Sequence, residues 1–317
     1  LGSDSVPVTL RDIARTCGVD VSTVSRALRD DARVRPATRI RIQEEAVRLG
    51  YRPNIAARNL VTGRTNTLCM LASGVIAFQD PRFTQAASER CHELDFDLLL
   101  NLHHNQRAAM ERAYRRLRQF TVDGVLVLPC WTPGEVDLAR GLVEGGFPLI
   151  CVDRPLPDLP VRCITSDNDA AITDLLQACA ASGATHLATA FRDGDEVVRG
   201  RQRMADGERR RLGLATWDGQ SSLPPDACPA LLANQQPDVL RWLDGHPAAA
   251  DVLNLVACFD DWEGPIAPAR CVLVCRQDYA AVGRRAAEEL IALVRRERTN
   301  AAEVIRIPYA RIDTLPA

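Results

Sequence analysis

Side chains suited to reading nucleic-acid bases gather on one short helical pattern near the start of the chain. Ser22, Ser25 and Arg26 share one face of this pattern, while Val24 and Leu28, four residues apart, share the opposite face. A helix with small polar residues at its N-terminus and an arginine one turn later can enter the major groove of DNA, where a guanidinium binds guanine O6 and N7. The chemistry indicated is readout of base edges, although Arg26 on its own would be an ordinary solvated charge.

A second helical pattern precedes this one and must hold it in place. Thr9 and Asp12 have the spacing of a capping box, so they predict the start of the first helix. Gly18 can take the positive φ that ends this helix, and Asp20 can accept hydrogen bonds from the free N–H groups of the next. The first helix buries a stripe made of Leu10, Ile13, Ala14 and Cys17. Together the two patterns predict a helix-turn-helix unit with residues 21–29 as its recognition helix.

A third helix completes the predicted head. It begins at Pro36, turns Ile42, Ala46 and Leu49 inward, and ends at Gly50. Three helices of this length can close a small apolar core, so the sequence predicts an all-α domain at the start of the chain.

Charge is distributed unevenly along the 317 residues. Residues 1–64 carry 12 Arg against 5 Asp and 2 Glu, which is a net +5, so the remainder must carry −7 to give the total of −2. A basic head on an acidic body fits a DNA-binding module joined to a domain with another task. The chain contains no lysine, so all of its phosphate-facing positive charge would come from arginine.

The eleven cysteines are scattered, and none forms a C-x-x-C pair. Several lie inside apolar runs, which favours reduced, structural cysteines over a disulfide framework or a metal site. No run of about 18 apolar residues is present, and the first residues lack the charged-then-apolar order of a signal peptide. We therefore expect a cytoplasmic protein with no membrane partner and no cofactor.

Beyond residue 66, short apolar runs alternate with helical patterns. Strands or buried runs are predicted at 68–72, 96–102, 123–129, 148–153, 162–166, 186–190, 231–234, 252–258, 271–275 and 304–307. Helices are predicted at 82–94, 107–120, 135–144, 168–181, 199–211 and 278–296. This alternation predicts parallel sheets covered on both faces. A body of about 250 residues exceeds one core, so we expect two α/β lobes.

The residue order of the head resembles the LacI/GalR family of bacterial transcription regulators. The resemblance is carried by V-T-L-x-D-I-A from Val8, G-V-x-x-x-T-V-S-R from Gly18, and L-G-Y-x-P-N-x-x-A-R-x-L from Leu49. Arg35 departs from the family, which usually has a serine cap before the third helix. Weaker landmarks, such as Phe259-Asp260-Asp261, extend the resemblance over nearly the whole chain.

The resemblance implies a DNA-binding role for each matching residue of the head. Thr9, Ser25 and Asn54 match positions that contact phosphates, although Thr9 can also serve as a helix cap. Leu60 matches a leucine that wedges into the minor groove and kinks the duplex, whereas alone it would be an ordinary core residue. The full set implied is Thr9, Val21, Ser22, Thr23, Ser25, Arg26, Asn54, Ala57 and Leu60.

For the body, the resemblance implies two Rossmann-like lobes similar to a periplasmic sugar-binding protein, with three crossings between lobes. A small effector, often a sugar or a purine-like metabolite, would bind between them. The matching positions are Ser73, Phe78, Asp153, Asp167, Arg203, Trp217 and Asp260. Carboxylates and arginine can bind hydroxyls or anions, and tryptophan offers a stacking face. The alternatives are that Asp153, Asp167 and Asp260 only cap turns and that Trp217 belongs to the core.

The predicted organisation has three parts. A helix-turn-helix DNA-binding domain occupies residues 1–52, a hinge helix and linker 53–66, and an effector-binding and dimerisation core 67–317. Within the core we assign about 67–165 and 278–298 to the first lobe, and about 166–277 and 299–317 to the second. No leucine heptad follows residue 307, which favours a homodimer without a tetramerisation tail.

Three functions compete. The first is a repressor that binds a palindromic operator as a homodimer under the control of an effector. The second is a regulator without a working effector site, because Gln235-Gln236 replaces the family's Asn-Asp pair and residues 218–227, with two prolines, leave no room for an expected helix. The third, an enzyme, is disfavoured because no G-x-G-x-x-G, P-loop, G-x-S-x-G or H-E-x-x-H stretch occurs.

Overall fold

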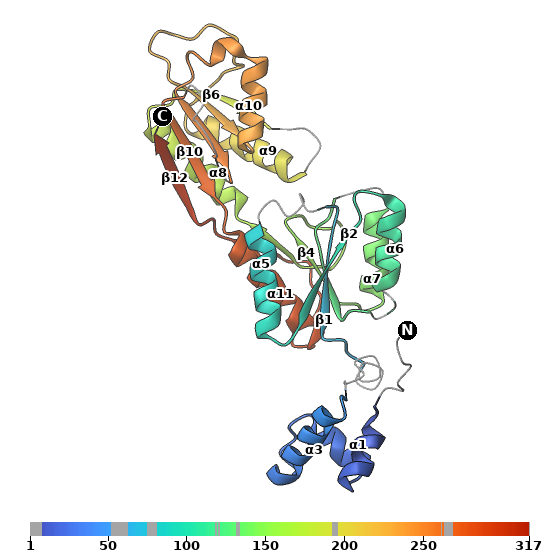
Figure 1. Cartoon of the computed structure of the whole chain (residues 1–317). Helices are drawn as coiled ribbons and strands as arrows, with labels where there is room; N and C mark the ends of the chain where they lie inside the picture. The colour runs from blue at the N-terminus through green and yellow to red at the C-terminus, as the bar shows by residue number, and fades with distance from the viewer. Residues whose placement is uncertain are drawn as a thin grey trace, which may run out of the picture. The chain divides into compact units, whose positions relative to one another are not determined.

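The computed structural model describes residues 8–51, 63–74, 81–117, 119, 121–130, 134–191, 196–260, 262 and 269–316 (Figure 1). The chain divides between Thr65 and Asn66 into two compact units, Leu1–Thr65 and Asn66–Ala317. Four residues with predicted roles, Asn54, Ala57, Leu60 and Phe78, lie outside the described residues.

The first unit is a helical head, as the sequence predicts. Its described helices are α1 (Leu10–Cys17), α2 (Val21–Ala27) and α3 (Pro36–Arg48). Ile13, Val24 and Ile42, one from each helix, are completely buried in a shared core. The recognition helix ends at Ala27, two residues before its predicted end.

The predicted start and end of α1 and the predicted start of α2 are confirmed. The Asp12 carboxylate accepts hydrogen bonds from Thr9 N at 3.0 Å and from Thr9 Oγ1 at 2.7 Å. Gly18 has the left-handed φ of 61° between α1 and α2, and Asp20 Oδ1 accepts from Ser22 N at 2.7 Å. Arg35 gives α3 no side-chain cap, as expected from its departure. These local bonds fix the start of α2, and hence the face that it exposes.

The second unit contains, in its described residues, two six-stranded sheets. The first sheet has the order β11-β5-β4-β3-β1-β2, and all of its neighbours are parallel. Its strands are β1 (Thr67–Ala72), β2 (Asp97–Leu102), β3 (Gly124–Val127), β4 (Leu149–Val152), β5 (Cys163–Ser166) and β11 (Val304–Ile307). The helices that pack on it are α5 (Pro81–Glu93), α6 (Arg107–Leu117), α7 (Glu135–Glu144) and α11 (Tyr279–Val294).

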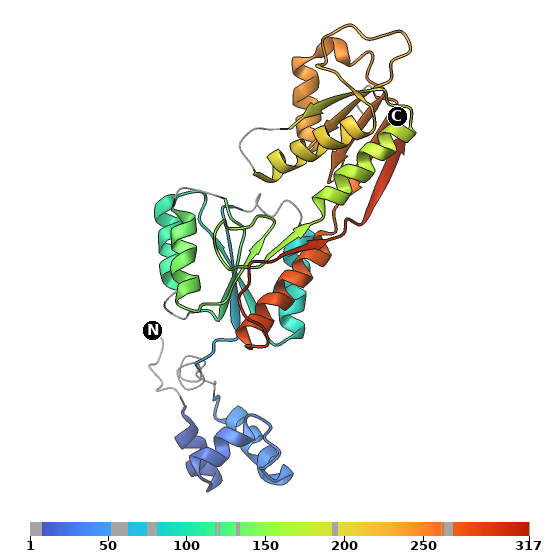
Figure 2. The same cartoon turned by 180° about the vertical axis from the view of Figure 1, so that it is seen from behind.

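Both faces of this first sheet are covered by helices. Alternate residues of β1 point to opposite faces, because the side-chain period of a strand is two. Leu68 and Met70 pack with α5 and α11, whereas Cys69 and Leu71 pack with α6 and α7. Figures 1 and 2 show the two helix pairs on opposite sides of the sheet. We call this sheet and its helices the first lobe.

The second lobe repeats the arrangement with one antiparallel edge. Its sheet has the order β12-β10-β9-β8-β6-β7, and only β12 runs antiparallel among the described strands. Its strands are β6 (His186–Ala190), β7 (Ala215–Thr216), β8 (Pro229–Ala233), β9 (Leu255–Phe259), β10 (Cys271–Arg276) and β12 (Arg311–Pro316). Its helices are α8 (Asn168–Ala181), α9 (Glu196–Arg211), α10 (Gln236–Gly245) and the short 3₁₀ helix η2 (Pro247–Ala249).

The chain passes between the lobes three times, as predicted. The passages run from β5 to α8, from β10 to α11, and from β11 to β12. The last passage corrects our lobe boundaries, because residues 299–307 belong to the first lobe. There β11 pairs with β5, and the Arg162 guanidinium donates to Glu303 Oε2 at 2.9 Å and to Thr299 O at 2.7 Å.

Four described elements of the second lobe were not predicted, namely β7, α10, η2 and β12. The expectation that residues 218–227 contain no helix is confirmed, since they form turns and extended chain. Asp218 Oδ1 organises the first of these turns by accepting hydrogen bonds from the backbone N–H groups of Gln220 and Ser221. None of the described helices combines the length and apolar character needed to span a bilayer.

The contact between α5 and α11 yields a stability prediction. A Cβ added at Gly283 would lie 2.3 Å from the carbonyl oxygen of Phe83, so Gly283→Ala must push the two helices apart. We expect a loss of about 1–3 kcal/mol in the free energy of unfolding, measured by urea denaturation. Gly200→Ala in α9 is the matched control, because its Cβ meets nothing within 4 Å. That change should stabilise by about 0.5–1 kcal/mol, and equal stabilities for the two variants would contradict the close packing.

Candidate functional site

The described DNA-binding candidates all reach the surface of the head. Thr9, Val21, Ser22 and Arg26 are exposed, and Thr23 and Ser25 are half-buried. The opposite face of α2 is closed off, because Val24 and Ala27 are completely buried. The structure therefore places the predicted residues on one accessible face of a short, capped helix.

Arg26 differs from several other arginines of the head in its electrostatic surroundings. Arg15 pairs with Asp12 at 2.8 Å, Arg33 with Asp31 at 2.6 Å, and Arg48 with Glu45 at 2.5 Å. Among the described residues, no carboxylate lies within 4 Å of the Arg26 guanidinium. An exposed guanidinium without such a pair keeps its donors available for another acceptor.

The carboxylate that caps α2 is held in its charged form. Hydrogen bonds from Ser22 lower the pKa of Asp20, and the positive charge of Arg26 lowers it further. An ionised carboxylate at this position stabilises the helix start through the helix dipole. At neutral pH the Asp20 carboxylate is therefore charged and caps α2.

A second group of polar side chains lies in the core, at the carboxyl ends of three strands. Asn234 follows β8, Asp260 follows β9 and Gln277 follows β10. Because the three strands are parallel neighbours, their carboxyl ends meet at one edge of the sheet, where ligands of open α/β folds bind. Arg201 of α9 and Tyr279 of α11 complete what we call the polar cluster.

Arg201 is the centre of this cluster and is buried. Its guanidinium donates to Asn168 Oδ1 at 2.6 and 2.9 Å, to Asn234 Oδ1 at 2.5 Å and to Gln277 Oε1 at 3.3 Å. The guanidinium carbon lies 3.9 Å from the centre of the Phe259 ring. Its described partners are thus neutral amides and an aromatic face, so the positive charge has no carboxylate directly against it.

Asp260 is the acidic member of the cluster. Its Oδ1 accepts from Gln277 Nε2 at 2.5 Å and from Tyr279 Oη at 2.6 Å, and its Oδ2 accepts from Gln235 Nε2 at 2.7 Å. A carboxylate oxygen has two lone-pair directions, so Oδ2 retains room for one further donor among the described residues. Burial and the charge of Asp260 raise the pKa of Tyr279 well above its usual value, which keeps that hydroxyl a donor at neutral pH.

Other predicted effector residues lie at the corresponding edge of the first lobe or cap a helix. Ser73 directly follows β1, and Asp153 directly follows β4 with a left-handed φ of 67°. The Asp153 carboxylate lies 3.2 Å from the Arg154 guanidinium, and its charge contributes to the raised pKa of Tyr279. Asp167 Oδ1 accepts from Ala170 N at 3.2 Å, so here the capping alternative describes the geometry.

Two predicted positions do not join the cluster. The Arg203 side chain is exposed, because two residues along a helix turn it by about 200° away from the buried Arg201. Trp217 is buried in the second-lobe core, with its ring edge-on to Trp242 at 5.8 Å and its Nε1 donating to Ser221 O at 3.2 Å. Its indole is therefore a core residue, not an open stacking face.

Sequence reasoning missed four members of the cluster. They are Arg201, Asn234, Gln277 and Tyr279. A usable signal existed for two of them. Asn234 directly follows an apolar run, Gln277 follows another after the single residue Arg276, and the residues after parallel strands meet at one edge. Gln235, noted only as a departure from the family pattern, proves to be a direct hydrogen-bond partner of Asp260.

These features define a class of protein, namely a helix-turn-helix head joined to a core of two α/β lobes with the periplasmic-binding-protein-like fold. Solved structures share this architecture. The lac repressor dimer bound to operator and the anti-inducer ONPF is 18% identical, with a TM-score of 0.73 and 98% of each chain covered. The transcriptional regulator CelR–cellobiose complex is 23% identical, with a TM-score of 0.62, covering 97% of this chain and 98% of that one.

Sequence comparisons show which known proteins the chain resembles. The profile described as "Bacterial regulatory proteins, lacI family" matches residues 9–54. The HTH-type transcriptional regulator PtxS of Pseudomonas putida is 32% identical over 180 residues, which are 56% of this chain and 51% of PtxS. Residues 9–54 thus match the LacI family of bacterial regulatory proteins, and the chain matches about half the length of the first curated relatives. These relatives are named as transcriptional regulators, which agrees with the expectation that the chain is not an enzyme.

Proposed function

We propose that the chain is a transcriptional repressor whose head reads a palindromic DNA operator and whose core binds a small metabolite. The observation that carries the DNA-binding half is the exposed Arg26 on α2, which has no carboxylate within 4 Å among the described residues. Val21 and Ser22 beside it would contact base edges, while Thr9 and Ser25 would contact phosphates. The protein would act in the cytoplasm.

The proposal includes a hinge at residues 53–60, which is supported by its sequence pattern alone. Residues 53–60 carry the P-N-x-x-A-R-x-L order, in which Asn54 would contact a phosphate and Leu60 would enter the minor groove. Two such leucines from two chains would bend the centre of the operator. Ala57 lies between these positions and belongs to the same predicted surface.

A homodimer is proposed because one recognition helix reads only half of a palindromic site. The first lobe offers a surface for it. Strand β2 is at the edge of its sheet, and Leu99 and Leu100 on this strand are 50% and 45% exposed. An exposed apolar edge strand is costly in water and favours pairing with another chain.

The polar cluster supports a small hydroxylated or anionic ligand in the core. The Arg201 guanidinium, the free direction on Asp260 Oδ2 and the amides of Asn234 and Gln277 together offer charged and neutral hydrogen-bonding groups. Sugars and sugar phosphates present hydroxyls and anions that match such a set. The similar CelR structure is a complex with cellobiose, which is consistent with a sugar for this chain.

A second candidate is a regulator that works without an effector. Asp260 already accepts three hydrogen bonds from side chains of the protein, and the segment 218–227 lacks a helix. A cluster satisfied by its own groups gains less from a ligand than an open one. The ligand experiment below separates the two candidates.

The first test concerns base readout. Arg26→Ala should weaken binding to a preferred inverted repeat by about 5- to 150-fold, because a bidentate contact to guanine contributes about 1–3 kcal/mol. The repeat would be selected from a random pool and affinities measured by fluorescence anisotropy at fixed salt. Arg210→Ala removes the same charge from an exposed site on α9 and should have little effect. Equal weakening on random duplex would contradict base readout by Arg26.

The second test concerns the dimer. Replacing Leu99 and Leu100 together by Glu should convert a dimer to a monomer, since like charges would face each other across the edge strand. Molar mass would be measured by light scattering after size-exclusion chromatography. Leu240→Glu is the matched control, because this leucine on α10 is similarly exposed at 48%. A doubly substituted protein that stays dimeric would place the interface elsewhere.

The third test concerns the ligand. In a thermal-shift screen of sugars and sugar phosphates, a ligand of the native state should raise the melting temperature. Arg201→Lys should abolish most of that rise while keeping the charge, because lysine cannot bridge Asn168, Asn234 and Gln277. Arg203→Ala, at the exposed neighbouring site, should leave it intact. A folded wild-type protein that responds to no compound would favour the regulator without an effector.

A further inference from the structure

A histidine without hydrogen-bond partners is buried in the first lobe, away from the polar cluster. His103 directly follows β2 and is 1% exposed. Neither Nδ1 nor Nε2 of its ring has a hydrogen-bond partner among the described residues. At least one ring nitrogen of a buried imidazole is normally hydrogen-bonded. The His103 ring therefore lacks a partner that its buried position would normally require.

The backbone holds this histidine firmly in place. His103 N donates to Ala72 O at 3.0 Å, and His103 O accepts from Gln106 N at 2.8 Å. These bonds tie the residue to the end of β1 on one side and to the turn before α6 on the other. The position of the ring is thus set by the sheet and not by the ring's own contacts.

A thiol and a carboxylate lie beside the same ring. Cys130 follows β3, and Glu135 is the first residue of α7 and is completely buried. One ligand atom from each of His103, Cys130 and Glu135 lies within 4.8 Å of the other two. Glu135 Oε2 accepts from Cys130 N at 3.1 Å and lies 3.5 Å from Cys130 Sγ. Three separate segments of chain therefore converge on one point.

The distances suit a small divalent ion. Zinc binds Cys, His and carboxylate ligands at about 2.0–2.3 Å, so the ligand atoms of a tetrahedral site are about 3.3–3.8 Å apart. The sulfur-to-oxygen distance of 3.5 Å already falls in this range. The remaining distances are at most 4.8 Å, so binding of the ion would draw the imidazole closer by up to about 1 Å.

The charges also balance. A thiolate, a carboxylate and a neutral imidazole around a divalent ion give a site with no net charge, which a buried location favours. Both ring nitrogens of His103 lack a hydrogen-bond partner among the described residues, so either one can offer a lone pair to the ion. The mixed sulfur, nitrogen and oxygen set is one that zinc prefers over calcium or magnesium.

We propose that His103, Cys130 and Glu135 form a binding site for a divalent transition-metal ion of the zinc class. The site lies in the first lobe, at the carboxyl ends of β2 and β3, and is independent of the DNA-binding and ligand-binding proposals above. It joins the ends of two strands to the start of α7.

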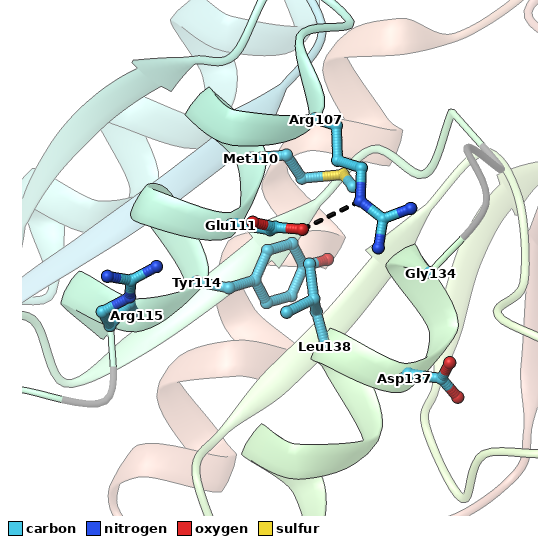
Figure 3. A pocket seen from close by; sticks show the side chains of 8 residues that line it. All are labelled: Arg107, Met110, Glu111, Tyr114, Arg115, Gly134, Asp137 and Leu138. Atoms are coloured by element: carbon cyan, nitrogen blue, oxygen red, sulfur yellow. Dashed lines mark hydrogen bonds and ion pairs between the residues drawn. The ribbon is translucent and has the colours of Figure 1, made fainter.

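A surface pocket of about 340 Å³ lies in the same lobe. It lies between α6 and α7, and Tyr114 and Gly134 are among its lining residues (Figure 3). Gly134 immediately precedes Glu135, and the Tyr114 hydroxyl is buried without a hydrogen-bond partner among the described residues. A water molecule would fill the fourth position of the ion.

The test uses the full, reduced chain freed of metal by a chelator and then dialysed. Zinc chloride titrated against a competing chromophoric chelator should show one tight site per chain, and bound zinc should raise the melting temperature. Cobalt(II) as a spectroscopic probe should give intense visible bands typical of tetrahedral coordination and a thiolate charge-transfer band. Absence of a tight zinc site in the folded wild-type protein would overturn the proposal.

Variants identify the ligands. His103→Ala and Cys130→Ser should each weaken zinc binding at least about tenfold, since even changes to groups that only support a ligand cost 10- to 100-fold. Cys130→Ser should also remove the cobalt charge-transfer band, which requires a thiolate. The matched controls are His104→Ala, next in sequence but exposed, and Cys228→Ser, a partly exposed thiol of the second lobe, and both should bind zinc as the wild type does.

The outcomes are distinct even if one variant folds poorly. Cys130→Ser is a near-isosteric change, so circular dichroism and melting without metal should confirm that it is folded. Unchanged zinc affinity in folded Cys130→Ser and Glu135→Gln would contradict the site. Loss of binding in Cys228→Ser would likewise contradict it, because the metal would then lie on another thiol.

Discussion

Parallel strand pairing is the constraint on which the core depends. A parallel neighbour can be reached only by a crossover, and β1, β2, β3, β6 and β8 are each followed by a helix that returns over a face of the sheet. The carboxyl ends of all such strands then lie at one edge, where backbone groups and first helical turns converge. Both clusters of chemically active side chains in the core lie at such an edge, one after β8, β9 and β10 and the other after β2 and β3. The strand order therefore determines which positions lie together at this edge, whatever side chains they carry.

The head is organised by short-range contacts instead. Asp12 bonds with Thr9 three residues away, and Asp20 with Ser22 two residues away. Such contacts cost little chain entropy to form, so they can be read from spacing along the sequence. The buried Ile13, Val24 and Ile42 are likewise found by helical periodicity. For this reason the capped helices and the exposed face of α2 could be predicted from sequence, with only the end of α2 misplaced.

The core was less predictable where its structure depends on long-range pairing. The segment 304–307 reads as a strand, but nothing in its composition says that it pairs with β5 and not with the second sheet. That choice depends on Arg162, more than a hundred residues earlier, which binds Glu303 and the carbonyl of Thr299. The sequence analysis placed Arg203, and not Arg201, among the effector residues for a different reason. The two side chains are chemically identical, and only their positions around helix α9 make Arg201 buried and Arg203 exposed.

The polar cluster joins the two lobes through residues at the start of α11. Tyr279 begins α11, whose other residues pack in the first lobe, yet its hydroxyl donates to Asp260 at the end of β9 in the second. Gln277, one residue before the cap of that helix, bonds with Asp260, Tyr279 and Arg201. A ligand that bound Arg201 or Asp260 would change their hydrogen bonds to Gln277 and Tyr279, which lie in the passage from β10 to α11. Coupling between sites needs an element whose contacts change between two states, and this short passage carries the hydrogen bonds of Gln277 and Tyr279 to Asp260 and Arg201.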